Sequence, residues 1–194
     1  MKMNYSLYAE STPNPAVMKF VSNRILVSED LEILSLEDAR QIPIASAIFN
    51  FPFVKGLFVS GNFIAITKNT DVKWDDIAMQ LRVFITNFLN KEGLEIIEEK
   101  MVKKAEQKIE KQEVSFSEME KRIAAILEEY ILPAVESDGG SISLNSFKDG
   151  VVSVVLKGAC SGCPSSSLTL KQGIEGLLKQ RFPNQIKEVV AHEE

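Results

Sequence analysis

The residues of this chain that could do chemistry are two cysteines separated by two residues. Cys160 and Cys163 are the only cysteines among 194 residues, and they lie in a loop rich in glycine and serine, residues 158–164. Two sulfurs at this spacing can bind one metal centre, or they can pair with each other as a dithiol redox site. Which of the two they do is the main functional question that the sequence raises.

The position of this loop favours ionised sulfur. The loop follows a predicted strand, residues 151–156, and precedes a predicted helix that begins near residues 165–167. A helix N-terminus presents unpaired amides and the positive end of the helix dipole, which favour a thiolate over a thiol. A thiolate serves equally as a metal ligand and as a redox nucleophile, so position alone leaves both interpretations open.

The number of ligands available suggests a shared centre. A structural zinc ion takes four ligands, and an iron–sulfur cluster is usually held by four thiolates. This chain has two cysteines and one histidine, His192, in a polar stretch near the C-terminus, and we do not expect His192 to be a ligand. Two copies of the loop would supply four thiolates, which predicts a centre shared across a homodimer.

Two other interpretations of the cysteine pair stay open. A dithiol oxidoreductase would use Cys160 and Cys163, although a predicted hairpin precedes the loop and Ala159 stands where an aromatic residue commonly precedes a thioredoxin-type pair. A zinc-bridged structural dimer would use the same four thiolates. Two inert, buried cysteines would be unusual in a loop so rich in glycine and serine. Spacing alone ranks metal or cluster binding first and redox chemistry second.

Composition and charge exclude several classes of protein. Hydrophobic residues make up 45% of the chain and charged residues 25%, as in ordinary globular proteins. A net charge of −5 offers no basic surface for a phosphate backbone, so we expect no nucleic-acid partner. The longest apolar region, residues 42–54, is interrupted by two prolines and is shorter than the roughly 20 residues of a membrane helix, so we expect no membrane partner.

The expected compartment is reducing. The first residues resemble neither a secretory signal nor a mitochondrial presequence, and two cysteines are too few for a disulfide framework. We therefore expect a cytoplasmic protein.

The pattern of apolar residues predicts two small α+β domains joined by a charged linker. We place the first domain at residues 1–90, the linker at 91–114 and the second domain at 115–194. Within residues 98–113, ten of sixteen residues are charged and Lys and Glu are interleaved, which is typical of a solvated spacer with some helical character.

The first domain contains no likely ligand set. It has neither Cys nor His, so we expect it to dock partners or to add stability. Gly61-Asn62 between two apolar runs predicts a hairpin, and apolar residues at three- and four-residue steps predict the helix that follows it. The expected elements are strands at 6–9, 17–21, 24–27, 54–60 and 63–67, a partly helical segment at 36–50, and a helix at 73–89.

The second domain is predicted to run helix, strand, strand, helix, strand. Ser117 and Glu120 form a capping-box pattern that begins the first helix, and Pro133 should kink or end it. A hairpin follows, with its turn at residues 148–150. The cysteine loop, the second helix and a strand at residues 186–190 complete the domain.

Several short segments carry a family resemblance. In the second domain they are Pro133-Ala134-Val135, Asp138-Gly139-Gly140, Gly158-Ala159-Cys160-Ser161-Gly162-Cys163-Pro164-Ser165-Ser166, Leu170-Lys171 and Gly173-Ile174-Glu175. In the first they are Thr12-Pro13-Asn14-Pro15, Met18-Lys19-Phe20, Val54-Lys55-Gly56 and Thr67-Lys68. Through these segments the chain resembles the NifU-like (Nfu) family of iron–sulfur cluster carriers, in both its N-terminal and its cluster-binding domain.

This resemblance implies a scaffold or carrier rather than an enzyme. Cys160 and Cys163 of two subunits would hold an iron–sulfur cluster, typically 4Fe–4S with 2Fe–2S as the other option. The implied partners are a second copy of the chain, upstream cluster-assembly proteins and apo iron–sulfur proteins. We expect transfer by thiolate exchange, in which the cysteines of a recipient capture the cluster stepwise.

Overall fold

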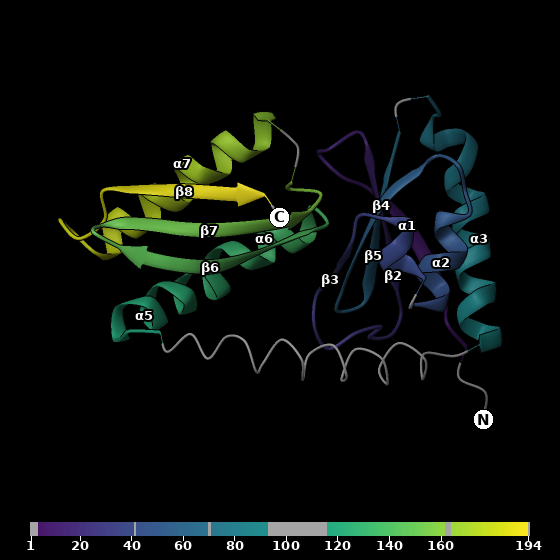
Figure 1. Ribbon diagram of the computed structural model, residues 1–194, viewed down its shortest axis with the longest axis horizontal. Coiled ribbons are helices and arrows are strands. Elements are labelled where there is room, and N and C mark those ends of the chain that lie inside the picture. Colours follow the sequence, from purple (N-terminus) through teal and green to yellow (C-terminus); the bar gives the residue numbers. More distant parts are fainter. Residues whose placement is uncertain (1–3, 41, 70, 93–115, 162–163, 194) are drawn as a thin grey trace. The chain divides into compact units, whose positions relative to one another are not determined.

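The computed structural model describes residues 4–40, 42–69, 71–92, 116–161 and 164–193. The chain separates into two compact units, Met1–Glu113 and Val114–Glu194. Helices and strands occur in both units (Figure 1), so the predicted α+β class is confirmed. The predicted linker lies almost wholly outside the described residues. No helix among the described residues is both long enough and apolar enough to cross a membrane.

The first unit is built on a five-stranded antiparallel sheet with the strand order β1-β2-β5-β4-β3. One face of this sheet and the helices enclose a single apolar core, to which β2 contributes Phe20 and β5 contributes Ile64 and Ile66. The elements are β1 (Leu7–Ser11), β2 (Val17–Ser22), β3 (Leu31–Ile33), α1 (Leu36–Ala39), α2 (Pro43–Phe49), β4 (Val54–Ser60), β5 (Phe63–Lys68) and α3 (Trp74–Glu92).

Helix α3 closes this core. Its buried side chains recur every four residues, at Ile77, Leu81, Ile85 and Leu89, and the last three are at most 1% exposed. Fully burying one such side chain stabilises a fold by about 1.5–3 kcal/mol, so this stripe accounts for the docking of the helix. The predicted helix is confirmed, but it extends to Glu92 and therefore beyond residue 90, where the sequence placed the end of the first domain.

One predicted strand of the first unit is wrong. Residues 24–27 form no strand; instead the backbone N–H groups of Leu26 and Val27 donate to the carbonyl oxygen of Gly61, at 2.7 and 3.2 Å. The segment therefore passes the turn of the β4–β5 hairpin instead of running along a neighbouring strand. Leu26 and Val27 are buried in the core, whereas Ile25 is 66% exposed, so the apolar run reflects two adjacent core residues and not the alternation of a strand. The sequence also missed the three-residue strand β3.

The second unit has a three-stranded sheet in which β7 lies between β6 and β8 (Figure 1). Strands β6 and β7 form the predicted antiparallel hairpin, whereas β8 runs parallel to β7. The order of elements is as predicted: α5 (Glu118–Ile126), a π-helix (Leu127–Ile131), α6 (Leu132–Ser137), β6 (Gly140–Lys148), β7 (Val151–Gly158), α7 (Pro164–Arg181) and β8 (Glu188–Glu193).

Pro133 changes the register of the first helix instead of ending it. Because proline has no N–H, it cannot donate to the carbonyl four residues earlier. The hydrogen-bond ladder passes through the π-helical turn Leu127–Ile131, and α6 begins again with Pro133 in its first turn. The three segments act as one helical layer, in which Ile123, Leu127 and Val135 are buried against the sheet.

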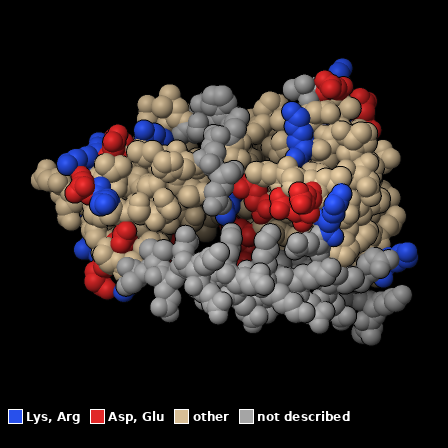
Figure 2. Space-filling model, in the orientation of Figure 1, with Lys and Arg blue, Asp and Glu red and all other residues tan. Residues whose placement is uncertain are grey.

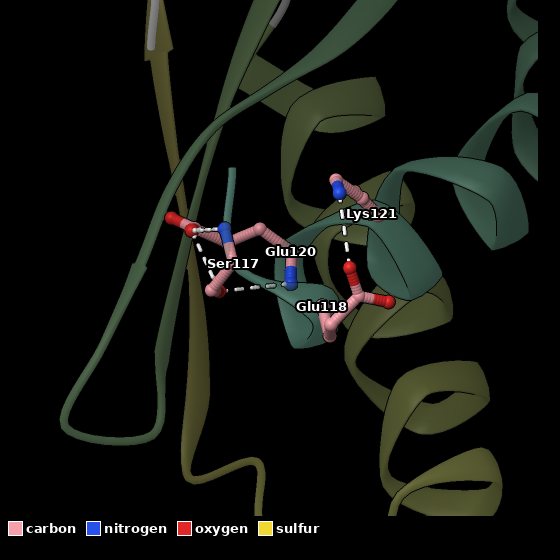
Figure 3. A network of polar contacts seen from close by, with 4 residues as sticks. All are labelled: Ser117, Glu118, Glu120 and Lys121. Atoms are coloured by element: carbon pink, nitrogen blue, oxygen red, sulfur yellow. Dashed lines mark hydrogen bonds and ion pairs between the residues drawn. The ribbon is translucent and has the colours of Figure 1, made fainter. Parts of the chain in front are cut away.

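The N-terminus of α5 is anchored to β6 through Glu120, whose capping contacts with Ser117 are drawn in Figure 3. The capping box is present as predicted: the Ser117 hydroxyl oxygen accepts from the Glu120 amide at 3.3 Å, and Glu120 Oε2 accepts from the Ser117 amide at 2.8 Å. The other carboxylate oxygen, Oε1, accepts from the amide of Phe147 on β6 at 3.0 Å. One side chain thus caps the helix and holds it to the hairpin.

On the face of the described residues that Figure 2 shows, basic side chains are dispersed, whereas several acidic side chains lie side by side. Lys and Arg side chains stand apart from one another there, among acidic and uncharged ones. That face therefore offers no broad basic surface among the described residues.

Replacing Ser117 tests the capping box. Ser117→Ala should lower the free energy of unfolding of the second unit by about 1 kcal/mol, because the Glu120 amide loses its acceptor. Hydrogen exchange of the α5 amides measures this loss. The matched control is Lys121→Ala, which removes only the ion pair with Glu118 between largely exposed side chains and should cost about 0.5 kcal/mol or less. Equal effects of the two substitutions would contradict the assignment.

Candidate functional site

The cysteine loop lies at the carboxyl end of the central strand of the second unit. Strand β7 ends at Gly158, and α7 begins at Pro164, four residues after Cys160. The chain then returns through α7 to the parallel strand β8, so the loop opens a strand–helix–strand crossover. Loops at the carboxyl ends of such strands commonly form ligand sites. The predicted position between a strand and a helix is confirmed.

Backbone hydrogen bonds fix the first half of this loop. Gly158 adopts a left-handed conformation (φ +66°), and its carbonyl oxygen accepts from both the amide and the hydroxyl of Ser161, at 3.1 and 3.0 Å. The amide of Ala159 donates to the carbonyl oxygen of Gly139, at 3.1 Å, just before β6 begins. The loop is therefore tied to both strands of the hairpin.

These ties direct Cys160 inward. The residue is 7% exposed, and it belongs to the same buried apolar cluster as Val135, Ile142 and Leu156. It lies beside Gly140, the residue paired with Gly158 in the hairpin. A methyl group added to the α-carbon of Gly140 would lie 2.9 Å from Sγ of Cys160 and 2.7 Å from the carbonyl oxygen of Lys157. Only glycine leaves room for the sulfur in this place.

The structure describes one of the two predicted ligands. Cys163 lies outside the described residues, so the pairing of Cys160 with Cys163 stays a prediction. Among the described residues, no three His, Cys, Asp or Glu side chains are grouped so that they could hold a metal ion.

His192, in the polar stretch near the C-terminus, lies in a strand that extends three residues past its predicted end at residue 190. It belongs to β8, opposite Val155 of β7, and it is exposed. The parallel pairing brings the C-terminal end of β8 to the end of the sheet that carries the cysteine loop. His192 is still three strand positions short of Gly158, or about 10 Å at 3.3 Å per residue.

The sequence missed the contribution of Gly139 and Gly140 to the site. From the sequence, Asp138-Gly139-Gly140 is typical of a turn or a helix stop, and Gly139 does adopt a left-handed conformation (φ +83°). In addition, Gly139 holds the loop through its carbonyl oxygen, and Gly140 leaves the space that Cys160 fills. The predicted hairpin could have indicated this contribution, because an antiparallel hairpin brings the start of β6 beside the end of β7.

Glu175 fixes the helix that follows the loop. Its Oε2 accepts from the amide of Val189 on β8 at 3.1 Å, and its Oε1 accepts from the ammonium group of Lys179 on the same helix. The hydrogen bond from Lys179, followed by that from Val189, holds the pKa of Glu175 below its ordinary value of 4.5. The amide of Ser117, followed by that of Phe147, lowers the pKa of Glu120 in the same way. Two carboxylates thus hold helices to the outer strands of this sheet.

Both carboxylates should titrate below their ordinary value. Since both pKa values are lowered on folding, their contribution to stability is complete above about pH 4.5 and is lost as the pH falls through the lowered values. The amide proton shifts of Phe147 and Val189, followed by NMR against pH, should therefore show midpoints below 4.5. Glu120→Gln should remove the titration at Phe147 and leave that at Val189. Midpoints above 4.5 would contradict these hydrogen bonds.

The fold and the site define a class: two-domain α+β proteins with a cysteine loop between a strand and a helix of the second domain. Residues 7–92 match the family model of the scaffold protein Nfu/NifU N-terminal domain, and residues 123–190 match that of the NifU-like domain. The chain therefore belongs to the NifU-like (Nfu) family.

Three relatives match along nearly the whole chain. NifU-like protein 4 and NifU-like protein 5, both mitochondrial proteins of Arabidopsis thaliana, are 30% and 31% identical over 186 residues, which is 94% of this chain and 64% and 66% of theirs. The human NFU1 iron-sulfur cluster scaffold homolog, also mitochondrial, is 30% identical over 179 residues, which is 91% of this chain and 68% of its own. The chain thus spans about two thirds of the length of these relatives. Because all three are named as mitochondrial, the predicted cytoplasmic location is not confirmed.

Proposed function

We propose that this chain is an iron–sulfur cluster scaffold and carrier, not an enzyme. The observation that carries the proposal is the place of Cys160: it lies in the strand-to-helix loop of the domain that matches the NifU-like family model. The human relative, matched over 91% of this chain, is named an iron–sulfur cluster scaffold.

The chemistry of the donors fits this cargo. Iron in such clusters is held by cysteine thiolates, usually four, and the chain supplies two thiols, Cys160 and Cys163. The proposed site is therefore half of a complete one, and two chains together hold one cluster as a homodimer. A 4Fe–4S cluster takes one thiolate on each of its four irons, which matches two chains with two cysteines each; a 2Fe–2S cluster also takes four.

Transfer proceeds by ligand exchange. A thiolate of the recipient forms a bond to iron as the bond from Cys160 or Cys163 to the same iron breaks, and the released thiolate takes a proton from solvent. No electrons change hands, so the step needs no oxidant or reductant. Four repetitions move the cluster from the dimer to an apo-protein. Upstream assembly proteins supply the cluster by the reverse exchange.

The first domain serves this function without binding iron. It contains neither Cys nor His. Its buried apolar side chains form a conventional hydrophobic core. Its role is to dock partners or to stabilise the chain.

Anaerobic reconstitution with iron and sulfide tests the proposal. The product should be a coloured dimer with about two irons and two sulfides per chain, as a 4Fe–4S centre shared by two chains requires. Iron and sulfide analysis together with size-exclusion chromatography measures both quantities. Cys160→Ser and Cys163→Ser should each abolish the bound cluster. The control is His192→Ala, which should retain it, since this exposed side chain is not expected to be a ligand.

Three results would contradict the proposal. A cluster that stays bound to a monomer would exclude a shared site. Half a zinc ion per chain in a dimer that takes up no iron would indicate the zinc-bridged structural dimer. Reduction of insulin disulfides, with a reversible Cys160–Cys163 bond, would indicate the dithiol oxidoreductase.

A further inference from the structure

The sulfur of Cys160 occupies a recess that exists because Gly140 has no side chain. Gly140 begins β6 and pairs with Gly158, the last residue of β7. An added Cβ at Gly140 would lie 2.7 Å from the carbonyl oxygen of Lys157, 2.9 Å from Sγ of Cys160 and 3.2 Å from its Cβ. Approaches below 3.0 Å are essentially never seen for real Cβ atoms. The sulfur therefore occupies the volume that any larger residue at position 140 would need.

The surroundings hold the sulfur in this recess. The hydrogen bond from the Ala159 amide to the Gly139 carbonyl keeps the loop against the start of β6, and Ala159 is only 3% exposed. Cys160 packs with the apolar side chains of the second core and is 7% exposed. A thiol in this position is shielded from solvent. A cluster shared with a second chain, in contrast, needs the sulfur at the protein surface.

We propose that Gly140 is a positioning residue that gives the Cys160 sulfur an inward resting place, from which the sulfur moves out to bind iron and to which it returns on release. This inference deepens the proposed function and rests on it. Because the inward state competes with iron for the sulfur, the apparent affinity for the cluster is the intrinsic affinity multiplied by the fraction of chains whose sulfur is outward. Gly140 thereby favours release of the cluster to a recipient.

The inward place of the sulfur adds a final step to the ligand exchange at Cys160. A recipient thiolate forms its bond to iron, the bond from Sγ of Cys160 to that iron breaks, and the sulfur takes a proton from solvent. The neutral thiol then enters the recess beside Gly140. A neutral thiol is buried there more favourably than a charged thiolate, because the surrounding side chains are apolar. Once the sulfur is inward, it no longer competes with the recipient for the iron.

The first experiment measures access to the sulfur in the iron-free full chain. In the Cys163→Ser background Cys160 is the only thiol, and its alkylation by iodoacetamide is timed in buffer and in urea. The folded chain should react about tenfold or more slowly than the unfolded one, as for a group reached only through local opening. Gly140→Ala should remove most of this protection, because its methyl group displaces the sulfur.

Two controls separate positioning from general loosening of the fold. Gly173→Ala on α7 adds a methyl group that meets nothing within 4 Å and should leave the alkylation rate unchanged. Val152→Ala removes core volume at the far end of β7, so it should lower the melting temperature without exposing Cys160 in the folded chain. Circular dichroism confirms that each variant is folded. If Gly140→Ala does not fold, the test is the alkylation rate of Cys160 in the folded chain with Gly140, compared with its rate in the same chain unfolded in urea.

The second experiment measures release from the cluster-loaded dimer, with both cysteines present. Gly140→Ala should transfer its cluster to an apo-ferredoxin several-fold more slowly than the unmodified chain, while Gly173→Ala transfers it at the unmodified rate. Absorption of the cluster and activity of the acceptor follow the transfer. A site that is merely destabilised should instead lose its cluster faster than the unmodified chain. Val152→Ala is the control that measures this effect.

The outcomes are distinct. Equal alkylation of folded and unfolded chains, or of folded chains with and without Gly140→Ala, overturns the resting place. Faster cluster loss from Gly140→Ala overturns its role in release. Failure of the unmodified chain to take up iron overturns the proposed function instead, and the alkylation arm, which needs no iron, still decides whether Gly140 positions the sulfur.

Discussion

The pairing of β6 with β7 is the constraint on which the proposed site depends. It brings Gly139 and Gly140, at the start of one strand, beside the loop that leaves the other, so that a backbone hydrogen bond from Ala159 closes the loop. The other contacts of the unit support this arrangement: Glu120 holds the first helix to β6, and Glu175 holds α7 to β8. The first of these contacts fixes the strand that carries Gly140, and the second fixes the helix that follows the loop.

As the carrier proposed above, the chain would have two properties that a tight metal site lacks. With two thiols per chain, no single chain satisfies a cluster, so each chain contributes only part of the binding free energy and exchange can proceed one ligand at a time. With an inward place for one of these thiols, the empty site is also a stable state of the fold. The first domain contributes neither property, since its core is conventional and it has no Cys or His.

Much of this could be predicted from the sequence, because local patterns determine it: the α+β class, the β4–β5 hairpin, α3, the capping box and the loop between β7 and α7. The inward place of Cys160 could not be predicted. Counting back from the turn at residues 149–150 would pair Gly140 with Ala159, but a bulge between Leu144 and Ser146 shifts the pairing to Gly158. The parallel pairing of β8 was likewise missed, because it depends on contacts across the chain that no local pattern records.

The central claim is that one cluster is held by the cysteines of two chains. Native mass spectrometry of the anaerobically reconstituted full chain tests this claim most directly, because it counts chains and cluster atoms in the same particle. The account predicts a mass of two chains plus one 4Fe–4S cluster, and single chains without iron after Cys160→Ser. A single chain that carries a whole cluster, or a dimer that holds two, would contradict it.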